Sequence, residues 1–474
     1  MQHTDPPHKP LVAVAGASGF VGTHLRRQLS DLFDFRALSR SSHVVEHNVG
    51  EQTTQWRECD LYSLPKLSQA LVGCDYAIYL VHSMAPSSRM LQGDFEDTDL
   101  LLADNFIRAA EEAGIRHVIY LSGLMPESVD GAVSTHLRSR CEVERSLRSR
   151  SVPVTVLRAG LIFGAGGSSF SMLVNLVRRL PLMFLPAWVD SKTHSIDIDN
   201  VCQAFRLCLR DPLLRGGIYD LGGHQPMTYR EMILKTGQLL GRPVRTIDLS
   251  LNLFSISKYL VAYFSGVSSA LVGPLLASLQ HDLKARPNVL LERMSQDMIS
   301  FEQSFYRAVD AEGMPLPNPR SHTQRADKQH IKRARRVRSV QRMPLPLGWD
   351  AHQIAVAYGG WLTRRFGGWI DAEKDAAGVL RFYALGRKVT LLELTPTPYC
   401  VGGDRCAFYI SGGVLSRKVD PPGRFEFRLM PTSNCLIASI HGFAPTLPWW
   451  FYARTQAVAH LRVMRGFARY LGSL

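Results

Sequence analysis

Three regularly spaced glycines follow an apolar pentapeptide near the start of the chain. Residues 11–15 read LVAVA, and glycines stand at positions 16, 19 and 22. Gly16 permits a tight turn, Gly19 lets a bound group approach the backbone, and Gly22 lets the following helix lie close to the strand. A helix that begins here points free N–H groups at that group. The pattern predicts binding of a dinucleotide pyrophosphate by Gly16, Ser18, Gly19, Phe20, Val21 and Gly22.

The residues after the next two expected strands bear on which dinucleotide is bound. An acidic residue after the second strand would bind the ribose hydroxyls of NAD, but this chain has Ser39 and Arg40. Arg40 with serine hydroxyls suits the 2′-phosphate of NADP. We expect NADP(H), with NAD(H) as the less favoured cofactor; a plain surface arginine is the alternative interpretation. Asp60, after the third strand, is placed to meet the adenine amino group or serves only in a turn.

Strands and helices alternate along the first third of the chain and position these residues. Short apolar runs predict buried strands, and amphipathic stretches between them predict helices. The predicted strands are 11–15, 35–39, 76–81, 117–121 and 154–157, and the predicted helices are 20–32, 64–72, 94–113 and 135–148. Such alternation indicates an α/β fold, a Rossmann-type doubly wound parallel sheet.

Several segments resemble the atypical extended short-chain dehydrogenase/reductases, and more narrowly a bacterial subgroup with an additional C-terminal domain of unknown function. The resemblance covers nearly the whole chain. It rests on residues 16–22, 59–61, 79–84, 120–124, 157–160, 194–201, 219–223 and 443–470. It implies that cofactor contacts are also made by Leu61, Val81, His82, Ala159 and Gly160. His82, after the fourth strand, is equally interpreted as a buried histidine with satisfied hydrogen bonds.

The resemblance also implies a catalytic set, from which this chain departs. The family has a serine near the fifth strand, matched by Ser122, and a helix with the pattern Y-x-x-S-K-x-x-x-E. Ser139 and Glu144 match that pattern, but His136 replaces the tyrosine and Arg140 replaces the lysine. Arg140 can still donate hydrogen bonds to a ribose. His136 is a candidate general acid, although Arg140 disfavours its protonated form; a polar residue without a proton-transfer role is the alternative.

The last part of the chain predicts a different architecture. Five runs indicate antiparallel strands, two helical stretches are expected around 349–369, and a long amphipathic helix is expected over 448–471. The runs are 379–385, 388–394, 405–415, 423–430 and 435–443. This order suggests a helix-grip (START-like) α+β domain, a type that commonly encloses an apolar cavity between sheet and helix.

Length and composition predict more than one domain. We expect a flexible tail at 1–10, the cofactor-binding domain at 11–310 with a substrate lobe built mainly from 165–310, a basic linker at 311–337, and the C-terminal domain at 338–474. Nine lysines and arginines with one acidic residue lie between 320 and 342, and they carry more than half of the net charge of +14. A solvated connector is the favoured interpretation of this segment, and attraction to anionic lipid or nucleic acid is the alternative.

Partners and location follow from the remaining features. The uncharged stretch 259–279 contains Gly266, Gly273 and Pro274, so two helices covering a pocket are favoured over a membrane span. The eight cysteines show no metal-ligand spacing and are expected in the core, and no metal is expected. We expect a cytoplasmic protein with a small hydrophobic ligand and without a nucleic-acid partner. Peripheral membrane contact through 259–279 or 320–342 stays open, and the oligomeric state is not predicted.

Three functions are compatible with these features. The favoured one is an NADP(H)-dependent reductase of a hydrophobic carbonyl, lipid or quinone, which relies on the glycine segment and on Ser122 with His136. The second is a non-catalytic NADP(H) sensor or assembly protein, which the missing tyrosine and lysine favour. The third is a carrier of a lipid or aromatic ligand in the C-terminal domain.

Overall fold

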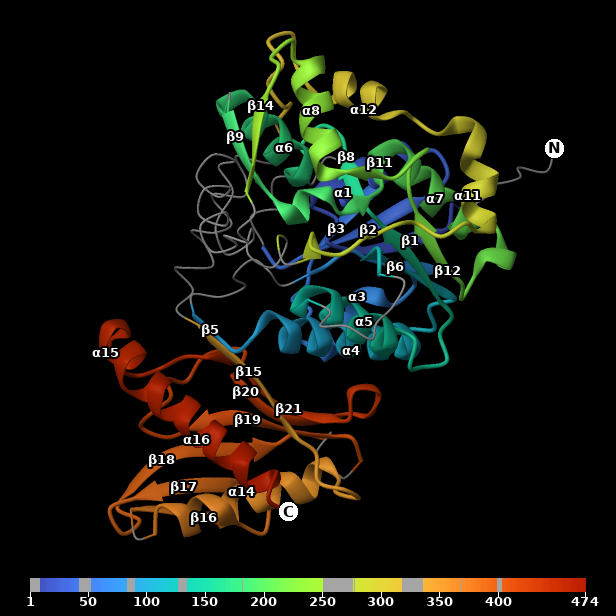
Figure 1. Cartoon of the computed structure of the whole chain (residues 1–474). Helices are drawn as coiled ribbons and strands as arrows, with labels where there is room; N and C mark the ends of the chain where they lie inside the picture. The colour runs from blue at the N-terminus through green and yellow to red at the C-terminus, as the bar shows by residue number, and fades with distance from the viewer. Residues whose placement is uncertain are drawn as a thin grey trace, which may run out of the picture. The chain divides into compact units, whose positions relative to one another are not determined.

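The computed structural model describes residues 9–41, 53–82, 90–126, 134–180, 182–249, 276, 278–317, 336–367, 369–398 and 403–474 (Figure 1). The chain folds into two compact units. The N-terminal unit comprises residues 1–85 and 102–327, and the C-terminal unit comprises residues 86–101 and 328–474. The described residues 90–101 therefore fold with the C-terminal unit, a partition that the sequence does not predict.

A seven-stranded parallel sheet forms the centre of the N-terminal unit. Its order is β12-β7-β6-β4-β1-β2-β3, and every neighbouring pair is parallel. The strands are β1 (Leu11–Ala15), β2 (Asp34–Ser39), β3 (Thr54–Glu58), β4 (Tyr76–Tyr79), β6 (His117–Gly123), β7 (Val154–Ala159) and β12 (Ile218–Leu221). The strand order reverses between β1 and β4, the place where parallel sheets of this kind commonly bind ligands. The predicted Rossmann-type fold is confirmed.

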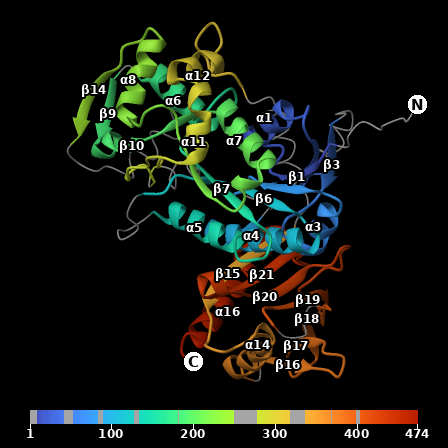
Figure 2. The same cartoon turned by 90° about the vertical axis from the view of Figure 1, so that its right-hand side faces the viewer.

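Helices cover both faces of this sheet (Figure 2). One face carries α1 (Phe20–Gln28) and α7 (Ile198–Arg210), and the other carries α3 (Leu64–Leu71), α4 (Phe95–Glu112) and α5 (Thr135–Leu147). Successive side chains of a strand point to opposite faces. In β1, Val12 and Val14 accordingly pack into the first apolar core, while Ala13 and Ala15 pack into the second. Burial on both faces explains why β1 is apolar throughout.

A smaller lobe is built on the same unit. Its elements are β8 (Leu161–Phe163), α6 (Ser168–Arg179), β9 (Leu182–Pro186), β10 (Lys192–Thr193), β11 (Ser195–Asp197), β13 (Met227–Thr228), α8 (Tyr229–Leu239), β14 (Arg245–Leu249) and α12 (Phe301–Ala308). Helix α11 (Val289–Met294) instead packs into the first apolar core of the parallel sheet through Leu290 and Met294. The predicted helix pair at 259–279 lies outside the described residues, except for 276, 278 and 279. In the described part of the chain, no helix has the length and apolarity needed to cross a membrane.

The C-terminal unit is an eight-stranded sheet with helices against it. The order is β16-β17-β18-β19-β20-β21-β15-β5, antiparallel except for the parallel pair of β15 and β5. The strands are β5 (Met90–Gln92), β15 (Val337–Pro344), β16 (Ile370–Lys374), β17 (Leu380–Ala384), β18 (Val389–Pro396), β19 (Arg405–Gly412), β20 (Arg424–Met430) and β21 (Cys435–Phe443). The helices are α14 (Ala351–Arg365), α15 (Trp449–Arg454) and α16 (Gln456–Leu471).

Several predictions for this unit need correction. A single helix, α14, replaces the two expected stretches, because a capping box of Asp350 and Gln353 starts it. The expected helix 448–471 is broken at Thr455, whose hydroxyl donates to the Phe451 carbonyl and whose backbone is not helical. Strand β15 was not predicted because Arg338 and Arg342 were counted in the basic segment; both are half-buried, and Arg342 pairs with Asp97 at 2.7 Å.

The cysteines are largely as expected. Cys59, Cys74, Cys202, Cys208 and Cys435 are buried free thiols, and Cys141 is a half-buried one. Cys406 is disulfide-bonded, which corrects the expectation of a plain core thiol there.

Candidate functional site

The glycine segment forms a tight turn between β1 and α1. Gly16 has φ of +89°, a conformation that glycine adopts without strain, and its carbonyl accepts the Gly19 N–H at 3.0 Å. A Cβ atom on Gly22 would lie 2.5 Å from the Gly16 carbonyl oxygen. Gly22 is therefore required by the close packing of helix against turn, as its spacing predicts.

The amino end of α1 is open to an anion. Gly19 is the N-cap, no side chain caps the helix, and its first turn contains no acidic residue. A Cβ atom on Gly19 would lie 3.2 Å from the Gly16 carbonyl oxygen, a tight contact that requires a small shift of this backbone. Uncapped N–H groups at the positive end of a helix dipole favour a phosphate. This turn fits a dinucleotide diphosphate.

The ends of β2 and β3 lie beside β1, where an adenosine half would extend. Ser39 is buried and its hydroxyl accepts the Ser41 N–H at 3.2 Å, whereas Arg40 is exposed. The Asp60 carboxylate accepts the Tyr62 N–H at 3.3 Å, and the Leu61 carbonyl accepts from Asn105 at 2.8 Å. Asp60 thus has the turn role given as its alternative, and an adenine contact remains a prediction.

The end of β7 is fixed by packing. A Cβ atom on Gly160 would lie 2.0 Å from the His194 carbonyl oxygen, and the Ala159 carbonyl accepts the Leu124 N–H at 3.1 Å. Any side chain at 160 would push β7 away from the segment before β11. Packing alone therefore explains why position 160 is a glycine. The predicted contact of Gly160 with the cofactor would be made by its backbone atoms.

Ser122 does not stand alone at the end of β6. Its hydroxyl donates to Glu144 Oε1 at 2.8 Å, and Arg158 holds the same carboxylate, with Nη2 2.6 Å from Oε2 and Nε 3.0 Å from Oε1. Ser122 and Glu144 are both buried. The serine hydrogen is committed to a carboxylate, which leaves the oxygen only as an acceptor for a substrate.

His136 and Arg140 lie one turn apart on α5, so they share a face of the helix. Burial, then the charges of Arg140 and His82, lower the pKa of His136 to about 3. His82 follows β4, and part of its side chain is exposed to solvent. Desolvation by the neighbouring protein, and then the positive charge of Arg140, lower its pKa to about 4. The structure therefore brings His82, His136 and Arg140 together, with both imidazoles neutral at pH 7.

Tyr120 was missed as a member of this cluster. It is fully buried in β6, and its hydroxyl accepts a hydrogen bond from Arg140 Nη1 at 3.1 Å. Desolvation raises the pKa of this hydroxyl, so it stays neutral. No sequence pattern pointed to the pair, because it arises only when β6 and α5 pack together. Among the residues described, no group of three or more His, Cys, Asp or Glu side chains could hold a metal ion.

Comparisons with known proteins agree with this geometry. Residues 16–168 match the family described as NAD(P)H-binding. Auxiliary protein GraX of Staphylococcus aureus is 29% identical over 115 residues, which are 24% of this chain and 37% of GraX. The chain thus matches little more than a third of GraX. A (4-alkanoyl-5-oxo-2,5-dihydrofuran-3-yl)methyl phosphate reductase of Streptomyces griseus is 26% identical over 246 residues, 51% of this chain and 78% of the enzyme.

A solved structure shares the fold. A nucleoside-diphosphate-sugar epimerase from Staphylococcus aureus superposes with a TM-score of 0.50 at 16% identity, covering 63% of this chain and 99% of the epimerase. At this identity the likeness concerns the fold alone. Together with the glycine turn and the sheet order, the family match shows that the N-terminal unit contains an NAD(P)H-binding domain of the Rossmann type.

Proposed function

We propose that the protein is an NADP(H)-dependent reductase of an uncharged, mainly apolar carbonyl compound, of the lipid or quinone type. The observation that carries the proposal is the state of His136. Its Nδ1 atom is buried without a hydrogen-bond partner among the described residues. A buried polar atom without a partner costs free energy, and a ligand oxygen beside it would remove that cost.

The low pKa of His136 specifies what this side chain does. A neutral imidazole has one N–H donor and one acceptor nitrogen, so His136 polarises a carbonyl by donating a hydrogen bond instead of delivering a proton as an imidazolium. When bound, NADPH would supply the hydride, which adds to the carbonyl carbon. One proton from solvent would complete the alcohol, so that carbonyl, NADPH and H⁺ would give alcohol and NADP⁺. The nearby charge of Arg140 stabilises negative charge that develops on that oxygen.

The surroundings of His136 support an apolar substrate. Its neighbour Leu137 packs with Leu124, Met125 and Leu283 in a small apolar cluster, with Cys141 partly buried against it. Leu124 and Met125 follow β6 directly after Ser122 and Gly123. A substrate that reaches His136 would meet these side chains, which favours hydrocarbon over charged groups.

NADP is favoured over NAD by charge. Arg40 is exposed directly after Ser39, and β2 ends without an acidic side chain. An acidic residue there would repel a 2′-phosphate, whereas a guanidinium forms charge-assisted hydrogen bonds with it. The Streptomyces relative is named as a reductase, which agrees with reductive use of the cofactor.

A second candidate is a protein that binds NADP(H) without turnover. It is favoured by the engagement of the Ser122 hydroxyl with Glu144 and by the replacement of tyrosine and lysine by His136 and Arg140. The relative GraX is named as an auxiliary protein. The same cofactor turn would then serve as a sensor of the NADP redox state or as part of an assembly.

Turnover separates the two candidates. NADPH oxidation is followed at 340 nm with an aliphatic aldehyde and with a methyl-substituted naphthoquinone, using wild type, His136→Phe, and His352→Phe in the C-terminal unit as control. The reductase predicts turnover that falls at least about tenfold in His136→Phe and persists in the control. NADPH binding without turnover by the wild type, or full activity of His136→Phe, would contradict it.

A further inference from the structure

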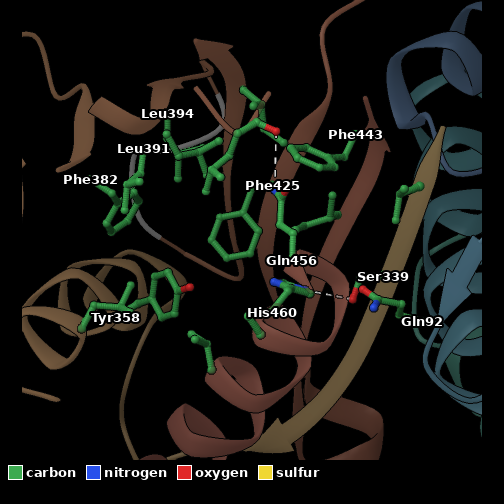
Figure 3. A pocket seen from close by; sticks show the side chains of 18 of the residues that line it. Gln92, Ser339, Tyr358, Phe382, Leu391, Leu394, Phe425, Phe443, Gln456 and His460 are labelled. Atoms are coloured by element: carbon green, nitrogen blue, oxygen red, sulfur yellow. Dashed lines mark hydrogen bonds between the residues drawn. The ribbon is translucent and has the colours of Figure 1, made fainter. Parts of the chain in front are cut away.

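A cavity of about 240 Å³ lies within the C-terminal unit. It is bounded by the sheet on one side and by α14 and α16 on the other (Figure 3). Most of its wall is hydrocarbon, including Phe382, Leu394, Phe425 and Phe443. Protein interiors pack closely, so a void of this size in an aromatic core loses many dispersion contacts unless something fills it.

One end of the cavity is polar, and its two amides are oriented by the backbone. Gln92 Nε2 donates to the Ala457 carbonyl at 2.9 Å, and Gln456 Nε2 donates to the Leu415 carbonyl at 3.4 Å. These bonds fix which amide atom is nitrogen, since a carbonyl can only accept. The oxygens of both amides therefore remain as the atoms that require donors.

Both oxygens are buried without such a donor. Gln92 Oε1 and Gln456 Oε1 have no hydrogen-bond partner among the residues that the structure describes. Gln92 is only 8% exposed, and its side chain lines the cavity. A buried acceptor without a partner is costly, so two at one end of an otherwise apolar cavity indicate a place for a donor group.

The charge of the lining excludes several ligand classes. No charged side chain is among the described residues that line the cavity. His460 faces it near Gln92, donates to or accepts from Ser339 Oγ at 3.1 Å, and has its pKa lowered to about 4 by burial, so it is neutral (Figure 3). A carboxylate would lose its hydration and meet two amide oxygens, which repel it.

We propose that this cavity is a binding site for an uncharged, mainly apolar molecule that carries one hydroxyl or N–H donor. The donor would bond to the unpartnered oxygen of Gln92 or to that of Gln456, and the hydrocarbon part would lie against Phe382, Leu394 and Phe425. A 150 Å³ cavity holds benzene, so 240 Å³ accommodates on the order of ten non-hydrogen atoms. An aromatic or medium-chain alcohol meets these requirements. The site is independent of the proposed reductase function.

Matched probes test the donor requirement on the full chain. Isothermal titration compares 2-naphthol, which has the donor, with 2-methoxynaphthalene, which lacks it, and with 2-naphthoate, which is anionic. We expect 2-naphthol to bind at least about tenfold more tightly than either. Gln456→Leu removes one acceptor and should reduce the preference for naphthol over its methyl ether to about threefold or less. Equal binding of the three probes would overturn the proposal. Absence of binding by all three would also overturn it, because water alone would then satisfy the two amide oxygens.

Two variants on α16 locate the binding. Val463 lines the cavity, whereas Val458 is 37% exposed and does not line it. Val463→Trp should abolish naphthol binding, and Val458→Trp should leave it unchanged, with thermal unfolding confirming that both fold. If Val463→Trp binds naphthol like the wild type, the probe occupies another place and the assignment is wrong. Should Val463→Trp fail to fold, the loss of selectivity in Gln456→Leu still decides the outcome.

Discussion

Arg158 and Glu144 form a nearly buried ion pair, 2.6 Å between Nη2 and Oε2, and the Ser122 hydroxyl is bonded to the same carboxylate. The side chains are 13% and 6% exposed. Ser122, Arg158 and Glu144 come from β6, β7 and α5, so these contacts link the three elements. Glu144, which matches the family pattern at the sequence level, acts here by holding Ser122 and Arg158 in place.

Replacing Arg158 should destabilise the N-terminal unit strongly. Arg158→Met leaves Glu144 buried without a countercharge, which costs about 3 kcal/mol. Urea unfolding measures this, and the relevant transition is the one that NADPH shifts to higher urea, because a ligand stabilises the unit that binds it. The matched control is Lys284→Met, which breaks an exposed pair with Asp282 and should change stability by about 0.5 kcal/mol at most. If Arg158→Met and Lys284→Met both change the free energy of unfolding by a similarly small amount, Arg158 is not required for the stability of the N-terminal unit.

Stability should fall in mild acid because three imidazoles have lowered pKa values in the folded protein. The pKa of His136 is lowered to about 3, and those of His82 and His117 to about 4, from an ordinary 6.5. Below pH 6.5 the unfolded chain takes up protons that the folded chain excludes. The stability of the N-terminal unit is therefore highest above pH 6.5 and decreases as the pH falls from 6.5 toward 4.

His136→Gln isolates one contribution to this loss. The variant cannot take up that proton in either state, so the decrease in unfolding free energy between pH 7 and pH 5 should shrink by on the order of 1 kcal/mol. Urea titrations of variant and wild type at both pH values measure it. Identical pH dependence would mean that His136 titrates normally in the folded protein, and its role as a neutral hydrogen-bond donor would then be lost.

Cofactor preference should depend on Arg40. A charge-assisted hydrogen bond contributes about 1.5–3 kcal/mol, so Arg40→Ala should weaken NADPH binding roughly 10- to 100-fold while NADH binding changes little. Fluorescence titration with both dinucleotides gives the two dissociation constants. Arg245→Ala, at an exposed position in β14, serves as the control. An unchanged NADPH-to-NADH ratio in Arg40→Ala would assign the preference to other residues.

The parallel sheet could be predicted because its strands and turns are local signals. Strand β1 is apolar on both faces, and the glycines at 16, 19 and 22 follow it at fixed spacing. The cluster around His136 could be predicted only as a set of residue types. Whether Ser122 points to a substrate or to Glu144 depends on how three elements pack, and nothing in the linear order of residues specifies that contact.

The C-terminal unit shows the same limit. Its apolar strands were predictable, but β15 contains half-buried arginines, and its pairing with β5 joins residues 247 positions apart, such as Met90 and Val337. Gln92 consequently lines a cavity formed otherwise by the last third of the chain. The expected apolar cavity between sheet and helix is confirmed. That Gln92 and Gln456 line it could be found only from the folded structure.

Gly19→Ala tests the central claim, that a dinucleotide diphosphate rests on the amino end of α1. At φ of −77° alanine fits the backbone, although its methyl group lies 3.2 Å from the Gly16 carbonyl oxygen and requires a small shift there. The same methyl group removes the close approach of the diphosphate. Gly360→Ala in α14 is the control, since no atom lies nearer than 3.7 Å to its added methyl. By calorimetric titration with NADPH, we predict binding by wild type and Gly360→Ala, and affinity at least about tenfold weaker in Gly19→Ala, with a cooperative thermal transition confirming that this variant is folded. Wild-type affinity in Gly19→Ala, or no binding by the wild type, would contradict the account.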